Sequence, residues 1–165
     1  MPHLSTPLTL SATGSIVGSA WISGGISALS ICAIPAVLAS GAPTDGLVRA
    51  WYAQFSRALH MPAIAVVASL NYFYLAYRHN AAGREWRGYA AGGVANLLLP
   101  PFTVVFIHGI NSTLMASMSA SAAAAGKGLT HDAARQLIAR WGNLNFYRIF
   151  PPLAGAALGL WNLLQ

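Results

Sequence analysis

The chain has 165 residues, of which 56% are hydrophobic and only 7% are charged. Soluble domains carry roughly 25% charged residues, so the composition excludes a soluble core inside a solvated surface and indicates an integral membrane protein. The net charge of +6 does not indicate nucleic acid, because most basic residues flank apolar runs and no basic stretch is interleaved with aromatic residues.

Four segments are long enough to cross a bilayer, which takes about 20 apolar residues. The sequence therefore predicts an all-α integral membrane fold, a four-transmembrane-helix bundle within a single membrane domain covering residues 1–165. The predicted spans lie near residues 12–39, 59–77, 89–115 and 144–164.

The first span carries a serine at every fourth position, from Ser11 to Ser27. Small residues at this spacing let membrane helices approach closely, so the stripe predicts a helix-packing seam rather than a pore-lining face. Gly155 and Gly159 repeat the pattern in the fourth span.

An amphipathic helix is predicted between the first two spans, in "TDGLVRAWYAQFSRALH". Its Leu47, Trp51, Phe55 and Leu59 recur at helical spacing. Further along, "ASMSASAAAAGKG" predicts a helix end followed by a flexible loop, because it is low in complexity. "LTHDAARQLIARW" then predicts a helix capped by Thr130 that continues into the fourth span.

Polar residues gather where three predicted spans meet one side of the membrane. His108 and Asn111 lie three residues apart at the end of the third span, which predicts a shared helical face. Trp141, Asn145 and Arg148 form one face at the start of the fourth span, and Tyr52 and His60 lie around the start of the second. Polar residues at membrane depth indicate a functional site, here a pocket with apolar walls and few polar contacts.

Proline pairs interrupt the same two spans. Pro100-Pro101 and Pro151-Pro152 remove backbone donors, so both pairs predict kinks, which can open a cavity between the third and fourth spans.

Each of these residues also has a structural interpretation. Arg148 can extend to lipid headgroups, His108 can be a hydrogen-bonded core residue, and His60 can be interfacial. Asn111 and Asn145 can hold helices together, while Trp141 and Tyr52 can belong to an aromatic belt at the membrane surface.

Three stretches together resemble the small four-span membrane anthrone oxygenases of fungal polyketide pathways. They are "ISGGISALSICAIPAVL" with the following "WYAQFSRALH", then "WRGYAAGGVANLLLPPFTVVFIHGINSTL", and "RWGNLNFYRIFPPLAGAALGLW". The third span is similar to the family in its Pro-Phe-Thr stretch ending in Asn111-x-x-Leu114, and the fourth in Trp141, Asn145, Arg148, Pro152 and Gly155. His108 is not among the positions that carry the resemblance.

The resemblance implies a membrane enzyme that oxidises an anthrone to an anthraquinone with molecular oxygen and without an organic cofactor. On this hypothesis His108 or His60 is the base, and Arg148, Asn111 and Asn145 stabilise the anion that forms. Substrate-binding residues would be Trp141, Tyr52, Tyr74, Thr103 and Phe106. The expected partners are a hydrophobic aromatic substrate and the lipid bilayer, in an endomembrane if the source is fungal. Assembly into a homo-oligomer is left open.

Two alternatives remain at this point. A membrane oxidase could hold haem, copper or iron through His60 and His108, although no HxxxH or Cys/His spacing supports a metal site. A non-enzymatic scaffold or carrier for a biosynthetic complex is the other.

Overall fold

The computed structural model describes residues 6–118 and 128–165. Every regular element in this part of the chain is a helix, which confirms the predicted all-helical class there. Three helical stretches are long and apolar enough to cross a membrane: Thr6–Ala39, Thr44–Ala81 and Arg87–Ser117. The predicted fourth span is not among them, so the count of four stays a prediction.

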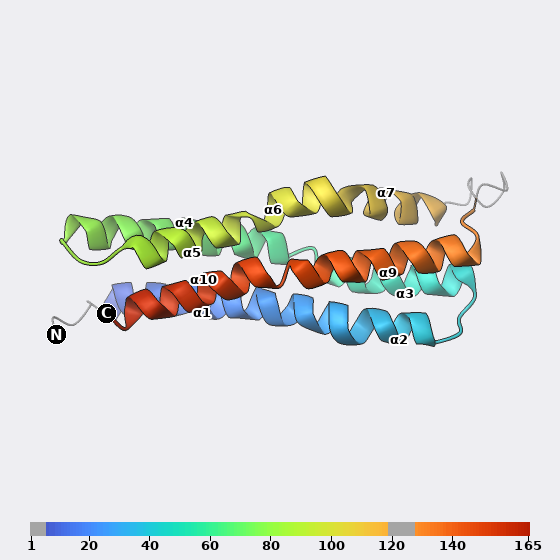
Figure 1. Cartoon of the computed structure of the whole chain (residues 1–165), viewed down its shortest axis with the longest axis horizontal. Coiled ribbons are helices and arrows are strands. Elements are labelled where there is room, and N and C mark those ends of the chain that lie inside the picture. The colour runs from blue at the N-terminus through green and yellow to red at the C-terminus, as the bar shows by residue number, and fades with distance from the viewer. Residues whose placement is uncertain (1–5, 119–127) are drawn as a thin grey trace. The chain divides into compact units, whose positions relative to one another are not determined.

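The chain divides into two compact units, each assembled from separate stretches of sequence (Figure 1). The first unit comprises the described residues up to Gly24, together with His60–Pro101 and Arg148–Gln165. The second comprises Gly25–Leu59 and the described part of Phe102–Tyr147.

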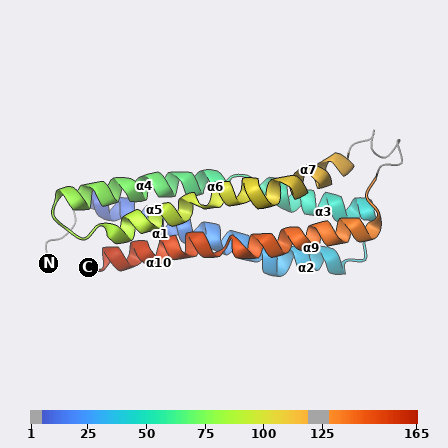
Figure 2. The same ribbon diagram turned by 45° about the horizontal axis from the view of Figure 1, so that its top comes forward.

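The first unit is built around α5, which packs against both α4 and α10 (Figure 2). The helices of this unit are α1 (Thr6–Ser27, up to Gly24), α4 (Met61–Ala81), α5 (Arg87–Leu97), most of α6 (Leu99–Phe102) and α10 (Phe150–Leu163).

The serine stripe of α1 forms a polar contact with α4. Ser11 Oγ donates to Asn71 Oδ1 at 2.7 Å, and Asn71 Nδ2 donates to Ser15 Oγ at 2.7 Å and to the Ser11 carbonyl at 2.9 Å. Ser15, Ser19 and Ser23 are buried, which confirms the predicted packing seam over this part of the stripe.

The glycines of α10 let that helix approach its neighbours. The Tyr72 hydroxyl donates to the Gly155 carbonyl at 3.0 Å, and a Cβ placed on Gly159 would lie 2.5 Å from the Tyr72 hydroxyl oxygen. A Cβ on Gly155 would collide with the Asn96 side chain and lie 3.1 Å from the Gly92 carbonyl oxygen. The close approach predicted from the Gly155 and Gly159 spacing is confirmed.

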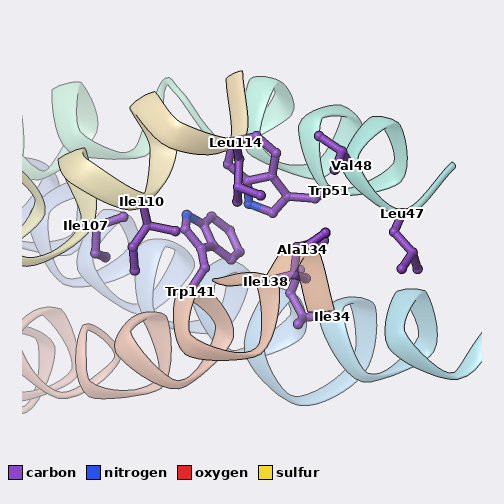
Figure 3. Packing of buried hydrophobic residues seen from close by; sticks show 10 residues of the cluster. All are labelled: Ile34, Leu47, Val48, Trp51, Ile107, Ile110, Leu114, Ala134, Ile138 and Trp141. Carbon is purple, nitrogen blue, oxygen red and sulfur yellow. The ribbon is translucent and has the colours of Figure 1, made fainter. Parts of the chain in front are cut away.

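The second unit holds an apolar core between α3, α7 and α9. Its elements are the end of α1, η1 Ala28–Ala33, α2 Ile34–Ala39, α3 Thr44–Arg57, η2 Thr103–Ile107, α7 His108–Ser117 and α9 His131–Tyr147. Ten buried residues form the core: Ile34, Leu47, Val48, Trp51, Ile107, Ile110, Leu114, Ala134, Ile138 and Trp141 (Figure 3).

Two local predictions in this unit are confirmed. Helix α3 is amphipathic, because Leu47 and Trp51 are buried while Asp45 and Arg49 form an exposed ion pair at 2.9 Å. It ends at Arg57, which leaves the expected Leu59 outside it and exposed. The Thr130 hydroxyl accepts a 3.2 Å hydrogen bond from the Ala133 N–H, as an N-cap does.

Both proline pairs interrupt their helices. Before Pro100-Pro101, α5 ends at Leu97, and a short α6 leads into the π-helix η2. Before Pro151-Pro152, α9 ends at Tyr147 and α10 begins at Phe150. The helix predicted to run unbroken into the fourth span is therefore interrupted, since prolines cannot donate to the preceding carbonyls.

The low-complexity stretch is tested only at its start. Helix α7 ends at Ser117, as predicted, and the predicted flexible loop falls on residues 119–127, which lie outside the described residues.

Candidate functional site

The centre of the candidate site is a hydrogen-bonded pair of side chains from α7 and α9, in the second unit. Trp141 Nε1 donates to Asn111 Oδ1 at 2.8 Å, and the exposed fractions are 2% for Trp141 and 6% for Asn111. Helix α9 packs on α7, which holds the two side chains together. The residues around the pair are largely apolar, so the amide lies where a hydrogen bond is electrostatically strong (Figure 3).

Asn145 lies one helical turn after Trp141 and is 1% exposed. Its amide nitrogen donates to the Trp141 carbonyl at 2.8 Å, within α9. Helical spacing therefore brings both residues to the buried face of α9, and the predicted face is confirmed for them.

Aromatic rings from α3 pack against the pair. The Trp51 ring meets the Trp141 ring edge to face, with centroids 6.1 Å apart, and stacks on Phe55 at 5.2 Å with an interplanar angle of 7°. Tyr52 is exposed beside them, with its ring 6.3 Å from that of Phe55. These rings give the second unit a series of flat aromatic surfaces leading from an exposed tyrosine to a buried indole.

His108 does not share the buried face of Asn111, contrary to the sequence-based expectation. It is exposed, and Ser112 makes hydrogen bonds to it, at 3.5 Å from Nε2 and 3.0 Å from its carbonyl oxygen. Positions three apart are separated by about 60° around a helix, and the edge of the buried face falls between these two. Phe106 is exposed in η2, whereas Thr103, also in η2, is half-buried.

The remaining predicted residues belong to the first unit. Arg148 is buried there, at 7% exposure, and is the first residue of the break between the end of α9 and the start of α10. His60 is exposed at the start of α4. Tyr74 is partly exposed on α4, where its hydroxyl accepts a 2.7 Å hydrogen bond from Arg78. The structure thus brings Asn111, Trp141 and Asn145 together within one unit.

No group of three or more His, Cys, Asp or Glu side chains with a metal-binding arrangement occurs in residues 6–118 and 128–165. The two histidines predicted as haem or metal ligands belong to different units, His60 to the first and His108 to the second, and the ligand pair stays a prediction.

Trp51 and His79 are buried side chains with polar atoms that the sequence does not single out for the site. The sequence places Trp51 on the apolar face of the amphipathic helix and His79 on the opposite side of the membrane from the predicted site. His79 is buried in the first unit, where Nδ1 lies 3.1 Å from the Glu85 carbonyl oxygen. Periodicity identifies such residues as core positions but does not show whether their polar atoms have partners.

The model of the anthrone oxygenase family matches residues 51–158. The anthrone oxygenase tpcL of Aspergillus fumigatus is 31% identical, covering 100% of this chain and 99% of its own. The monooxygenase hypC of Dothistroma septosporum is 29% identical over 88% of this chain and 78% of its own. The anthrone oxygenase AgnL2 of Paecilomyces divaricatus is 28% identical over 92% of this chain and 96% of its own.

No solved structure matches the chain. The family match covers well over half of the sequence and includes Trp51, Asn111, Trp141 and Asn145. It also extends to Arg148, which carries part of the resemblance seen in the sequence. The chain therefore belongs to the anthrone oxygenase family and is an oxidoreductase.

Proposed function

We propose that this protein is a membrane-embedded oxygenase that converts an anthrone to an anthraquinone with molecular oxygen. The family match over residues 51–158 carries the proposal, and relatives bearing the names anthrone oxygenase and noranthrone monooxygenase support it. The buried Asn111–Trp141 pair supports it from the structure, because it places a fixed amide among aromatic rings.

The membrane location rests on apolar surface. Three helical stretches are long and apolar enough to cross a bilayer, and large apolar side chains on them face outward, with Val104 69% and Val105 70% exposed. Contiguous apolar surface of this kind marks contact with lipid or another apolar phase. We assign α10 with the end of α9 as the fourth span, since Leu153, Leu160 and Trp161 are also exposed. A planar, apolar polyketide would partition into the same lipid.

The chemistry begins at the methylene carbon C10 of the anthrone, between two aromatic rings. Loss of a C10 proton to a base gives an anion whose charge is delocalised onto the ketone oxygen as a phenolate. This anion transfers one electron to oxygen, and the resulting radical and superoxide combine into a C10 peroxide. Loss of the second C10 hydrogen and cleavage of the O–O bond release water and leave the new carbonyl, so one O₂ yields one quinone and one water.

Stabilisation of the phenolate is the step that the Asn111 amide suits. The Trp141 indole N–H can only donate, so the amide atom facing it is the acceptor Oδ1 and the other end of the amide is the donor Nδ2. A fixed donor aimed at developing negative charge in a dry site lowers the barrier by about 3 kcal/mol. Asn145 and Arg148 remain predicted stabilisers on the strength of their chemistry and burial.

No organic or metal cofactor is required by this scheme, because the anion is electron-rich enough to reduce oxygen directly. Turnover that persists after exhaustive chelation, in protein without a Soret band or stoichiometric iron or copper, is the expected result. Loss of turnover on chelation, restored by one metal, would favour the haem or metal alternative.

The direct test is quinone formation by membranes containing the protein. Emodin anthrone is supplied with and without oxygen, and ¹⁸O₂ is used to follow the label into the quinone. Enzyme-dependent quinone should form only with oxygen and carry one ¹⁸O atom.

Asn111→Leu should lower the rate about 100- to 1,000-fold. Asn80→Leu, at an exposed position on α4, is the matched control and should retain it. A wild-type rate no higher than the spontaneous oxidation would overturn the proposal for this substrate.

A further inference from the structure

The Trp51 indole is fully enclosed although it carries a polar N–H group. The side chain is 0% exposed, and its Nε1 has no hydrogen-bond partner in the described part of the chain. A buried donor without a partner costs about 1–3 kcal/mol, and such groups are rare in folded proteins. The free energy lost at Trp51 therefore requires an explanation.

The side chains packed around Trp51 give its N–H no acceptor. The Asn111 Oδ1 atom accepts from Trp141, whose ring meets Trp51 edge to face, but Trp51 makes no such bond in the described part of the chain. Figure 3 draws the Trp51 and Trp141 rings in a cluster whose other side chains are aliphatic. None of the ten cluster residues carries a side-chain acceptor, which suits an oxygen atom supplied from outside.

The aromatic rings beside Trp51 on α3 indicate where a flat ligand would approach. Phe55 lies parallel to the indole, at 5.2 Å between centroids, and is only half-buried. Because Phe55 is one helical turn after Trp51, we expect a change of its rotamer to give a ligand access to the indole without moving α3. Exposed Tyr52 borders the same rings.

We infer that Trp51 is a substrate-binding residue whose indole N–H donates to the ketone oxygen of a tricyclic aromatic ligand. The ketone oxygen of the ligand approaches the edge of the indole near the ring plane, where the N–H can donate to it. An indole N–H only donates, so it selects a carbonyl or phenolate oxygen and stabilises the phenolate more than the ketone. The inference rests on the proposed function and names a second donor for its anion.

The experiment compares two ligands of the same shape. Anthraquinone has carbonyl oxygens and anthracene has none, and the affinity of each is measured with purified protein in lipid nanodiscs. Trp51→Phe should weaken anthraquinone binding about 3- to 10-fold, which is the fold-change expected from one neutral hydrogen bond. Anthracene binding should change less than twofold, because that ligand has no oxygen to accept the bond.

Trp21→Phe is the matched control, since Trp21 is exposed on α1. It should leave the affinity for both ligands unchanged. Equal losses for both ligands in Trp51→Phe would show a purely structural role and overturn the inference, as would no loss for either.

A second measurement does not depend on a well-folded variant. The chain has five tryptophans, so ¹⁵N-tryptophan labelling gives five indole N–H resonances. Anthraquinone should move the Trp51 resonance downfield, and anthracene should not. If anthraquinone shifts no buried indole resonance downfield, the inference is overturned. Wild-type turnover of emodin anthrone separates the two hypotheses. If the protein is active but Trp51 does not distinguish anthraquinone from anthracene, only this inference fails. If the protein is inactive, the proposed function fails.

Discussion

The indole of Trp141 on α9 donates a 2.8 Å hydrogen bond to the side-chain oxygen of Asn111 on α7, 30 residues earlier along the chain. Both side chains are buried, so neither can exchange the bond for water. The bond therefore does two things at once: it holds α7 to α9, and it fixes which end of the amide is the donor. A structural and a chemical role for Asn111 can be separated by experiment.

The stability contribution of this pair should appear as strong coupling between its two residues. Asn111→Leu leaves the Trp141 N–H buried without an acceptor, and Trp141→Phe leaves Oδ1 without a donor, so each should lower the free energy of unfolding by about 1–3 kcal/mol. The double variant leaves neither group buried without a partner, so its loss of unfolding free energy should be smaller than the sum of the two single losses. Equilibrium unfolding of the purified protein in mixed micelles measures this, and strict additivity would contradict the coupling.

The identity of the base can be decided between the two predicted histidines. His108→Ala or His60→Ala should lower turnover about 100- to 10,000-fold if that residue takes the C10 proton, because general-base catalysis by histidine has this magnitude. The affected variant should also show a larger isotope effect with C10-dideuterated anthrone. Both side chains are exposed, so added imidazole should partly restore the rate. Wild-type rates in both variants would exclude both residues as the base.

Arg148 is predicted to stabilise negative charge in the reaction. Arg148→Met removes the cation and should lower kcat/KM by about 100-fold or more. Arg148→Lys keeps the charge but loses the planar guanidinium, so its kcat/KM should lie between those of the wild type and Arg148→Met. Arg140→Met, at an exposed position eight residues earlier, is the control and should retain wild-type kcat/KM. Equal activity of the Arg148→Met and Arg140→Met proteins would leave Arg148 with a structural role only.

The packing of α10 should tolerate no side chain at Gly159. Its Cβ would lie 2.5 Å from the Tyr72 hydroxyl oxygen, which donates to the Gly155 carbonyl. Gly159→Ala should therefore cost about 1–3 kcal/mol through overpacking and lower the Tm in detergent. Gly109→Ala is the comparison, because a Cβ there would meet no atom of the described residues within 4 Å beyond its chain neighbours and its own helix backbone, and it should gain up to about 1 kcal/mol in helix propensity. Similar Tm changes in the two variants would contradict the packing argument.

Features that depend on a residue and its near neighbours could be predicted from the sequence alone. Helix type follows from apolar runs and the 3.6-residue period, the end of α5 and α9 from proline pairs without N–H donors, and the start of α9 from the Thr130 hydroxyl. The buried face of Trp141 and Asn145 follows in the same way from their spacing. The family could also be predicted from the sequence, because its motifs are short and local.

Which polar atoms meet, by contrast, depends on how the helices pack together. Spacing predicted one face for His108 and Asn111, but the neighbouring helices cover only the side that holds Asn111. Nor could spacing show that Asn111 accepts from Trp141 while the Trp51 N–H has no hydrogen-bond partner among the described residues. Hydrogen bonds between helices depend on the relative position and rotation of segments far apart in sequence, and no local period encodes that arrangement.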